Sequence, residues 1–309
     1  MNNPKFLLSL TTKDNDYQQE QAKAAEEAAH RLGVDLQIIY ADNDAITQSQ
    51  QLLTAIQSAA LRPTAIIFEP VGGTALPQVA RAAAMAGVAW VVLNRDADYI
   101  EEFRKQYRVP LFVVTADHEE IGRIQGRQFG ALLPQEGSVL YIQGPSENLA
   151  AKQRTAGMYE TKPAGVQVKL MKAHWTEESA YRAISSWLRL STSHEARIDV
   201  VAAQDDSMAA GARKAFQDNT TGTARERWIS LPFLGCDGLP KTGQAWVRSG
   251  VLAATVVSPP NANHAIEMLV QASRSGTEPR ERSLTPPYSF PTIPELAASA
   301  AKKARAQRA

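Results

Sequence analysis

Short apolar runs alternate with alanine-rich segments along nearly the whole chain, and this alternation predicts the secondary structure. The apolar run at 6–10 is followed by a helical pattern at 17–32, which Gly33 closes, and then by a second apolar run at 34–40. Glycine often ends helices because it adopts the left-handed conformation without strain, so these segments predict a βαβ unit. Further strand-like runs follow predicted helices at 65–68, 90–93 and 111–114. We therefore predict a parallel sheet with helices on both faces.

The same alternation begins again after Asp117 and predicts a second sheet of the same kind. Asp117 and Glu120 have the spacing of a capping box, in which two side chains satisfy free N–H groups at the start of a helix. Strand-like runs then occupy 138–142, 166–171, 198–203, 231–235 and 252–257. Proline stiffens a connection and does not extend a helix, so the pairs Pro259-Pro260 and Pro286-Pro287 favour crossings between the two units.

Length and composition agree with two domains and exclude several classes of protein. The chain has 309 residues, of which 44% are hydrophobic and 21% charged, and this is long for a single core. A formal net charge of +1 gives no general attraction to nucleic acid or to an anionic membrane. The single cysteine, Cys236, excludes an internal disulfide, and no Cys or His spacing matches a zinc site. We predict neither a metal nor a cofactor.

Neither end of the chain shows a recognisable targeting signal. The apolar run at 6–10 is too short for the core of a signal peptide, so we expect no export signal, and a cytoplasmic protein if this is the native start. No apolar stretch approaches the roughly 20 residues that a membrane-spanning helix needs, so we expect no membrane embedding. The basic, helix-prone residues at 295–309 predict a solvated helical or disordered tail.

Polar residues follow most of the predicted strands, at the edge where open parallel sheets bind ligands. In the first half these residues are Ser9, Thr11, Thr12, Asn15 to Tyr17, Glu69, Asn94, Arg95 and Asp96. In the second half they are Gln143, Gln204, Asp205, Asp206 and Asp237. Carboxylates and amides accept hydrogen bonds from hydroxyl groups, and the planar guanidinium of arginine donates several. These groups therefore suit a polyhydroxylated ligand. Each residue taken singly also fits helix capping, and the prediction depends on their joint placement.

Arg95 and Trp175 are the least easily explained of the residues that follow strands. Arg95 comes directly after the apolar run and Asn94, where a guanidinium has no obvious local role. Trp175 follows the run at 166–171. It fits either core packing or an aromatic wall against the apolar face of a sugar ring.

Four longer segments carry a more specific signal. They are WVVLNRDAD at 90–98, IQGPSENLAAKQRTAGM at 142–158, AAQDDSMAAGA at 202–212 and LGCDGLPKTGQAWVRSGVLAATVVSPP at 234–260. In order and spacing they resemble the ribose-type periplasmic binding proteins of bacterial ABC transporters, and the likeness covers roughly residues 5–290. The resemblance implies an α/β fold of two Rossmann-like lobes with parallel sheets, joined by a three-crossover hinge and closing on a sugar. We place the N-terminal lobe at 1–116 plus about 259–287, and the C-terminal lobe at 117–258 plus about 288–294.

The resemblance also implies which side chains face the ligand in the cleft between the lobes. Asn94 and Arg95 fall on the family's Asp-Arg pair, and Trp175 falls where a stacking Phe is expected. Arg154 and Asp237 match its cleft arginine and aspartate. With the residues after the first strand, the candidate ligand-binding residues are Ser9, Asn15, Tyr17, Asn94, Arg95, Arg154, Trp175, Asp205, Asp237 and Ser258.

Departures from the family pattern argue against ribose itself. Asn94 stands in place of Asp, Asp205 in place of Asn, and Ser258 at a hinge position that usually carries Gln. The segment before Tyr17 is also about two residues longer than the ribose pattern. Because these exchanges alter the arrangement of donors and acceptors, we predict another monosaccharide or a polyol.

We predict a binding protein and not an enzyme. The five histidines form no ligand or triad pattern, and no glycine-rich phosphate loop follows the first strand. Cys236 beside Asp237 could serve as a nucleophile, but a small buried hydrophobe is the commoner role of such a cysteine. The segment at 42–44 lacks the glycine and spaced oxygens of a calcium loop. A sugar-responsive repressor would need a helix-turn-helix domain before the first strand, for which this chain leaves no room.

Two roles stay open at this point. The resembling family works outside the cytoplasmic membrane and hands its ligand to an ABC permease, which requires export. Alternatively, the chain is a cytoplasmic ligand-sensing module of the same fold, whose partner is a sensor protein. We expect a monomer in either role.

Overall fold

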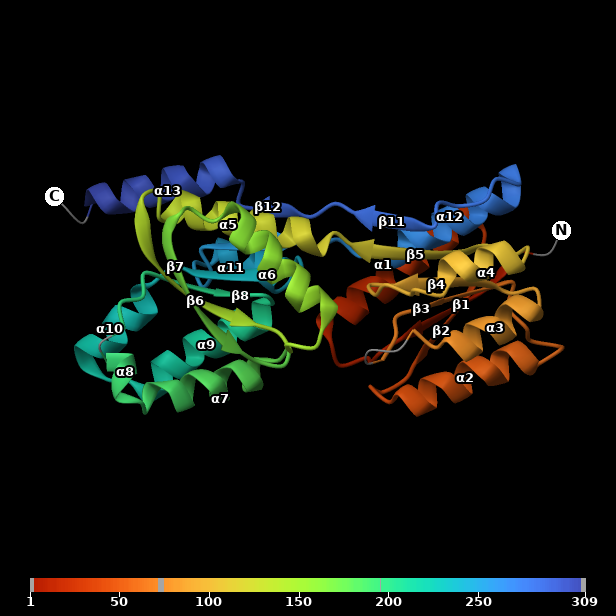
Figure 1. Cartoon of the computed structure of the whole chain (residues 1–309), viewed down its shortest axis with the longest axis horizontal. Coiled ribbons are helices and arrows are strands. Elements are labelled where there is room, and N and C mark those ends of the chain that lie inside the picture. The colour runs from red at the N-terminus through yellow and green to blue at the C-terminus, as the bar shows by residue number, and fades with distance from the viewer. Residues whose placement is uncertain (1–2, 72–74, 195, 307–309) are drawn as a thin grey trace. The chain divides into compact units, whose positions relative to one another are not determined.

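The computed structural model describes residues 3–71, 75–194 and 196–306, which form two compact units (Figure 1). Unit 1 comprises the residues up to Ala116 together with Pro260–Thr285. Unit 2 comprises Asp117–Pro259 together with the residues from Pro286 onward. The chain therefore passes between the units three times. Among the described residues, no helix combines the length and the apolar character that crossing a membrane would require.

Unit 1 is a parallel sheet with helices on both faces, as its sequence pattern predicts. Its strands are β1 (Lys5–Leu10), β2 (Asp35–Tyr40), β3 (Ala65–Phe68), β4 (Ala89–Leu93), β5 (Leu111–Ala116) and β11 (Arg282–Thr285), in the order β11-β5-β4-β3-β1-β2. The helices are α1 (Asp16–Leu32), α2 (Ala45–Gln57), α3 (Pro77–Met85), α4 (Ile100–Gln106) and α12 (Ala262–Ser275). Apolar residues of α1 and α12 pack on one face of the sheet, and those of α2, α3 and α4 pack on the other.

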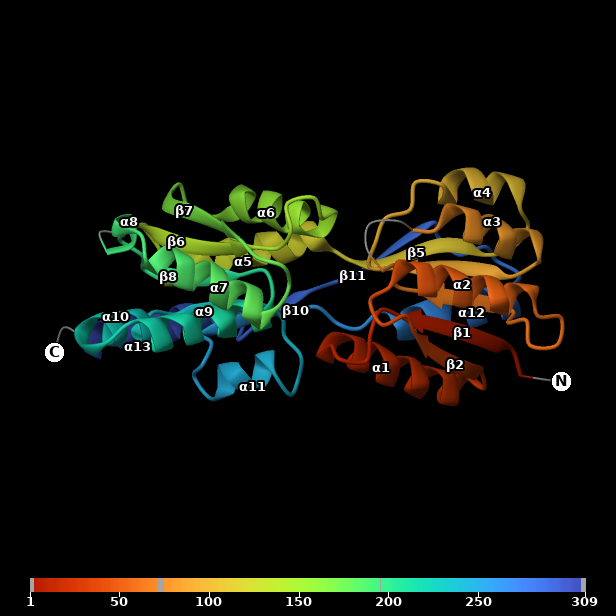
Figure 2. The same cartoon turned by 90° about the horizontal axis from the view of Figure 1, so that it is seen from below.

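Unit 2 repeats this topology with one reversed strand at the edge. Its strands are β6 (Glu136–Gln143), β7 (Gly165–Lys172), β8 (Val200–Ala203), β9 (Phe233–Asp237), β10 (Ala254–Val257) and β12 (Tyr288–Phe290), in the order β12-β10-β9-β8-β6-β7. β12 is antiparallel to β10, whereas the other neighbours are parallel. The helices are α5 (His118–Leu132), α6 (Leu149–Thr161), α7 (Glu177–Leu188), α8 (Ser191–His194), α9 (Asp206–Asn219), α10 (Gly222–Ser230), α11 (Gly243–Arg248) and α13 (Ile293–Ala306). Figure 2 shows the same elements from below.

Apolar side chains pack against the sheet of unit 2 in two layers. Residues of α7, α9 and α10 form one layer, in which Phe216 stacks on Trp228 with ring centroids 4.6 Å apart. Phe129 of α5, Met158 of α6 and Leu296 of α13 belong to the other. Within the described residues, the basic segment expected as a tail is helical up to Ala306, and Leu296 in the first turn of α13 is buried in this layer.

Strand order fixes where polar side chains gather in each unit. In unit 1 the chain goes from β1 out to β2 and then returns to β3 on the other side of β1; in unit 2 it goes from β6 to β7 and returns to β8. Loops that leave a parallel sheet in opposite directions open a crevice at the carboxyl ends of the strands, and ligands bind there. The predicted α/β class with two Rossmann-like sheets is confirmed.

Candidate ligand-binding site

A chain of buried amide side chains in unit 1 ends on the carboxylate of Glu69, directly after β3. Glu69 Oε2 accepts from Gln18 Nε2 at 2.9 Å and from Asn94 Nδ2 at 3.1 Å. Asn94 Oδ1 accepts from Asn261 Nδ2 at 2.6 Å, and Asn261 Oδ1 accepts from Gln21 Nε2 at 2.7 Å. Because a carboxylate only accepts, Glu69 sets the direction of each amide in the chain. Protein groups thus form hydrogen bonds with both Nδ2 and Oδ1 of the Asn94 side chain.

The other predicted residues of unit 1 lie around this network to different degrees. The Tyr17 hydroxyl accepts from Asn94 Nδ2 and from Gln21 Nε2, each at 3.4 Å. Ser9 is buried on β1, and its hydroxyl accepts from Gln48 Nε2 at 3.1 Å. Arg95 is half-buried and donates to the Asn94 carbonyl at 2.7 Å. Asn15 is exposed and caps α1 by accepting from the Gln18 backbone N–H at 3.2 Å, so its observed contact is structural.

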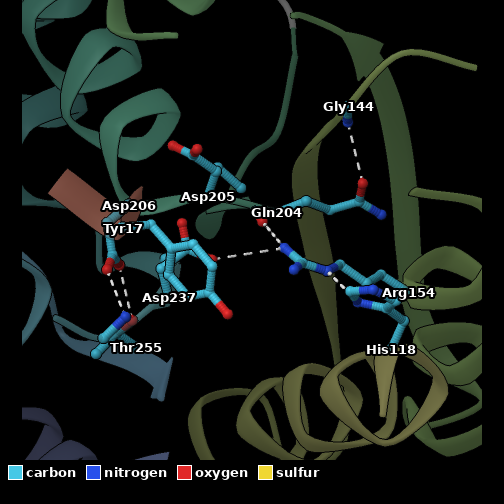
Figure 3. Close-up of polar contacts among 12 residues, drawn as sticks. Tyr17, His118, Gly144, Arg154, Gln204, Asp205, Asp206, Asp237 and Thr255 are labelled. Atoms are coloured by element: carbon cyan, nitrogen blue, oxygen red, sulfur yellow. Dashed lines mark hydrogen bonds and ion pairs between the residues drawn. The ribbon is translucent and has the colours of Figure 1, made fainter. Parts of the chain in front are cut away.

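In unit 2, the guanidinium of Arg154 stands at the centre of the polar contacts (Figure 3). Arg154 lies on α6 and is only 7% exposed. Its Nε donates to His118 Nδ1 at 3.4 Å, and its Nη1 donates to the carbonyl of Gln204. Nη1 also lies 3.9 Å from Asp237 Oδ1, which is an ion pair without a hydrogen bond. The guanidinium carbon lies 5.5 Å from the centroid of the Trp175 ring, a cation–π distance.

Asp205 and Asp206 are adjacent in sequence but differ in their hydrogen bonds. Asp205 caps α9 and accepts from the Met208 backbone N–H at 2.8 Å. Asp206 accepts from the Gly238 backbone N–H and from the Thr255 hydroxyl, each at 2.7 Å. Asp206 therefore ties the loop after β9 to β10, and its role is structural.

Asp205 and Asp206 are buried and Asp237 is partly buried, and the Arg154 guanidinium lies beside Asp237. Burial, followed by the charge of Asp237, raises the pKa of Asp205 to about 8. Burial likewise raises the pKa of Asp206 well above its ordinary value, and Asp237 adds to this shift. Burial also raises the pKa of Asp237, against the opposing attraction of Arg154. The unliganded site therefore disfavours the full negative charge that these residues would carry in water.

Trp175 and Ser258 complete the predicted set in unit 2. The Trp175 ring packs closely over Gly144, where an added Cβ would come 2.2 Å from Trp175 Cζ2. The ring also contacts the apolar layer of α7 and α9 and stays partly exposed, so core packing and a free ring edge coexist. Ser258 is buried, and its backbone N–H donates to the Asp237 carbonyl at 3.0 Å.

Three of the predicted residues have left-handed backbones at the ends of strands. The φ angles are 56° at Asn94, 59° at Trp175 and 98° at Asp237. Such conformations cost on the order of 1–3 kcal/mol each outside glycine, and they cluster at functional sites. Their position at the carboxyl ends of β4, β7 and β9 supports a binding role for these loops.

Several residues of the two clusters escaped the sequence prediction as contacts of the site. They are Gln18, Gln21, Glu69, His118, Gln204, Asp206 and Asn261. Glu69 and Gln204 directly follow β3 and β8, Asp206 begins α9, and all three are among the polar strand-end residues found in the sequence but not among its candidate contacts. Asn261 lies 167 positions from its partner Asn94, and no local pattern reveals such a contact.

Two doubly wound α/β units, each with polar side chains clustered at the carboxyl ends of its strands, define a two-lobed binding protein. The comparison with known families agrees, since the family described as "Periplasmic binding protein domain" matches residues 6–278. The chain belongs to this family.

Three binding proteins share between 24% and 30% sequence identity with the chain. A putative rhizopine-binding protein of Rhizobium meliloti is 30% identical over 190 residues, which cover 60% of this chain and 58% of that protein. A D-apiose import binding protein of Paraburkholderia graminis is 25% identical over 278 residues, which cover 88% of this chain and 82% of that protein. The ribose import binding protein of Escherichia coli is 24% identical over 257 residues, covering 83% and 79%.

Solved structures share the fold at lower identity. A solute-binding protein of Actinobacillus succinogenes with bound D-allose superposes with a TM-score of 0.80 at 20% identity, covering 96% of this chain and 100% of that one. One from Bacillus halodurans with bound myo-inositol gives 0.75 at 22% identity, covering 98% and 99%.

Proposed function

We propose that this protein captures a monosaccharide or polyol at the carboxyl ends of its strands and delivers it to an ABC permease. The observation that carries the proposal is the grouping of Arg154, Asp237 and Trp175 in unit 2. Charged side chains that match ring hydroxyls, beside an aromatic face that matches the apolar side of the ring, are what sugar recognition requires. The family and the relatives that import sugars support this assignment.

We propose that each unit contributes ligand contacts at the carboxyl ends of its own strands. Unit 2 would contribute Arg154, Trp175, Asp205 and Asp237. Unit 2 would also contribute Ser258, and unit 1 would contribute Ser9, Asn15, Tyr17, Asn94 and Arg95. To these we add Glu69, because Asn94 is engaged at both amide atoms and Glu69 brings a carboxylate to the neighbouring strand end.

The proposal includes release of the ligand unchanged, without chemistry. Cys236, the one nucleophile suggested by the sequence, is buried, and burial raises the pKa of its thiol well above the ordinary value. The thiolate is the reactive form of cysteine, so this environment keeps the group inert. We propose that the protein acts as a monomer, as a one-to-one carrier does.

A thermal-shift screen against monosaccharides, polyols and nucleosides tests the proposed function. A ligand at 100 times its dissociation constant adds about 2.7 kcal/mol of stability. We expect at least one sugar or polyol to raise the melting temperature and to be recovered intact by mass spectrometry. Stabilisation by nucleosides alone, or conversion of the ligand, would contradict the proposal.

A further inference from the structure

The buried side chain of Gln204, directly after β8, joins the loop that follows β6 to helix α6. Its Oε1 accepts from the Gly144 backbone N–H at 3.0 Å. Its Nε2 donates to the Ala151 carbonyl at 3.0 Å and to the Thr155 hydroxyl at 2.9 Å. Ala151 and Thr155 lie about one turn apart on α6. One amide thus connects the loop at Gly144 to two successive turns of the helix.

The loop and the helix support the two side chains of unit 2 that lie within cation–π distance of each other. Helix α6 carries Arg154, whose Nη1 also donates to the Gln204 carbonyl (Figure 3). The loop carries Gly144, and the Trp175 ring packs so closely over it that an added Cβ would come 2.2 Å from Cζ2. The Arg154 guanidinium carbon lies 5.5 Å from the Trp175 ring centroid. Gln204 therefore contacts the supports of both side chains.

The groups around Gln204 fix which way its amide points. The Gly144 N–H can only donate, so it requires the amide oxygen. The Thr155 hydroxyl donates to the Ala151 carbonyl at 2.8 Å, so it is an acceptor toward Gln204 Nε2. An apolar side chain makes neither bond, and an amide that is one methylene shorter cannot reach Gly144 and α6 together.

We propose that Gln204 is a positioning residue of the ligand site, which holds Arg154 and Trp175 in the arrangement that binds the ligand. The inference rests on the proposed function, because it assigns this role in the same site. Gln204 is 0% exposed, so it acts on a ligand only through its neighbours. A site whose side chains are already ordered binds more tightly, because less conformational freedom is lost on binding. Loss of the amide leaves both side chains present but no longer fixed relative to each other.

The first test needs no ligand. Each of the five tryptophans has an indole N–H resonance in a proton–nitrogen correlation spectrum, and Trp175→Phe identifies that of Trp175. In Gln204→Met we expect this resonance to shift or broaden. Gly144→Ala, whose Cβ would displace the ring, provides the spectrum of a displaced Trp175. The resonance of Trp228, buried in the apolar layer of unit 2, should stay in place, which general loosening of the unit would not allow.

Two further variants make this test specific. Gln204→Asn keeps a polar amide in the core but is too short to join the loop to α6, so it should also move the Trp175 resonance. It decides the matter if Gln204→Met does not fold. Gln128→Met is the matched control, because Gln128 is equally buried and donates to the Thr255 carbonyl at 3.2 Å and the Ser289 hydroxyl at 3.0 Å. These partners lie on β10 and β12, so this variant should leave the Trp175 resonance unchanged.

The second test is titration calorimetry with D-allose, D-ribose and myo-inositol as probes. Both Gln204 variants should weaken binding about tenfold or more, because two freed side chains must be ordered again, whereas Gln128→Met should leave the dissociation constant unchanged. An unmoved Trp175 resonance, five resonances that move together, or an unchanged affinity would overturn the inference while the proposed function stands. If the unaltered protein binds no sugar or polyol, the proposed function fails, and the Trp175 resonance still decides whether Gln204 positions the ring.

Discussion

At the scale of single residues, the adjacent Asp205 and Asp206 differ in role: Asp206 stabilises the fold, and Asp205 is proposed to bind the ligand. The Asp206 carboxylate accepts hydrogen bonds from the Gly238 backbone N–H and the Thr255 hydroxyl, inside the protein. An added Cβ at Gly235 or Gly243 would come 2.0 Å from an Asp206 oxygen, so the site around that carboxylate is built to fit it. Asp205 uses its carboxylate only to cap α9. Because burial raises the pKa of Asp205 to about 8, its ionised form is a cost to the folded protein at high pH.

Replacing Asp205 by Asn should stabilise the unliganded protein. Asparagine caps helices as well as aspartate does, so the cap is kept while the buried charge is removed. The pKa of Asp205 is about 8 in the folded protein and about 3.9 when unfolded, so the folded form binds more protons between these values. Stability therefore falls as pH rises from about 4 to 8. Urea unfolding should show a shallower fall for Asp205→Asn and a gain of about 0.5–2 kcal/mol at pH 8.

The neighbouring substitution is the control for that prediction. In Asp206→Asn the amide oxygen can keep the bond from the Gly238 N–H, but the new NH2 group faces the Thr255 hydroxyl and no longer accepts its proton. A mismatched buried polar pair costs about 1–3 kcal/mol. We expect Asp206→Asn to destabilise the protein at pH 5. Equal effects of the two substitutions would contradict the division of roles.

Arg154 should matter more to ligand affinity than Arg123, a partly exposed arginine on the adjacent helix. Arg154→Ala removes the partner of Asp237 and the cation over Trp175. The loss should weaken ligand binding by about 1–3 kcal/mol, which is about tenfold or more. Arg123→Ala removes surface ion pairs with Glu119 and Glu160, and such pairs are worth at most about 1 kcal/mol. Calorimetry on both variants measures the difference, and equal dissociation constants would remove Arg154 from the site.

At the scale of elements, close packing of α5 against α6 positions both Arg154 and its partner His118. Glycines at the contact remove the side chains that would separate the helices. An added Cβ at Gly157 would come 2.0 Å from the Glu119 carbonyl oxygen, and one at Gly122 would come 2.0 Å from that of Arg154. Backbone atoms cannot move aside locally, so either substitution would have to shift a whole helix.

Gly157→Ala should therefore destabilise the protein, and Gly130→Ala should not. Overpacking typically costs about 1–3 kcal/mol, and the shift of α6 should also weaken ligand binding through Arg154. At Gly130 the nearest contact of an added Cβ is Pro163 Cγ at 3.4 Å, an ordinary distance. Because alanine favours helix by about 1 kcal/mol over glycine, Gly130→Ala should be neutral or stabilising. Thermal unfolding and calorimetry test both variants, and a stable Gly157→Ala variant with unchanged affinity would contradict this account.

Most helices and strands were predictable from the sequence, whereas the contacts between side chains far apart in the chain were not. Buried parallel strands read as continuous apolar runs, so β3, β4 and β8 are evident from AIIF, AWVVL and VVAA. The edge strands β11 and β12 escaped prediction because RSLT is largely polar and YSF has only three residues. The same limit applies to the site. Strand ends pointed to Arg95 and Asp237, but the Glu69 network joins residues far apart in the chain.

At the scale of the whole molecule, three crossings link the units, after Ala116, Pro259 and Thr285. The proline pairs Pro259-Pro260 and Pro286-Pro287, which the sequence pattern favours as crossings, stand at two of these three points. We expect a bound ligand to draw the units together, because polar strand ends in both are proposed to contact it. Small-angle scattering should show a smaller radius of gyration at saturating ligand. An unchanged radius would argue for binding within one unit.

The late strand β11 has a consequence for how the chain is made. It completes the sheet of unit 1 beside β5, yet it follows β5 only after nearly all of unit 2. A ribosome therefore exposes the unpaired edge of β5 while it synthesises residues 117–281. Unpaired edges recruit other strands, and domains otherwise fold in order as they emerge. Unit 1 is therefore synthesised first but cannot complete its sheet until β11 has emerged from the ribosome.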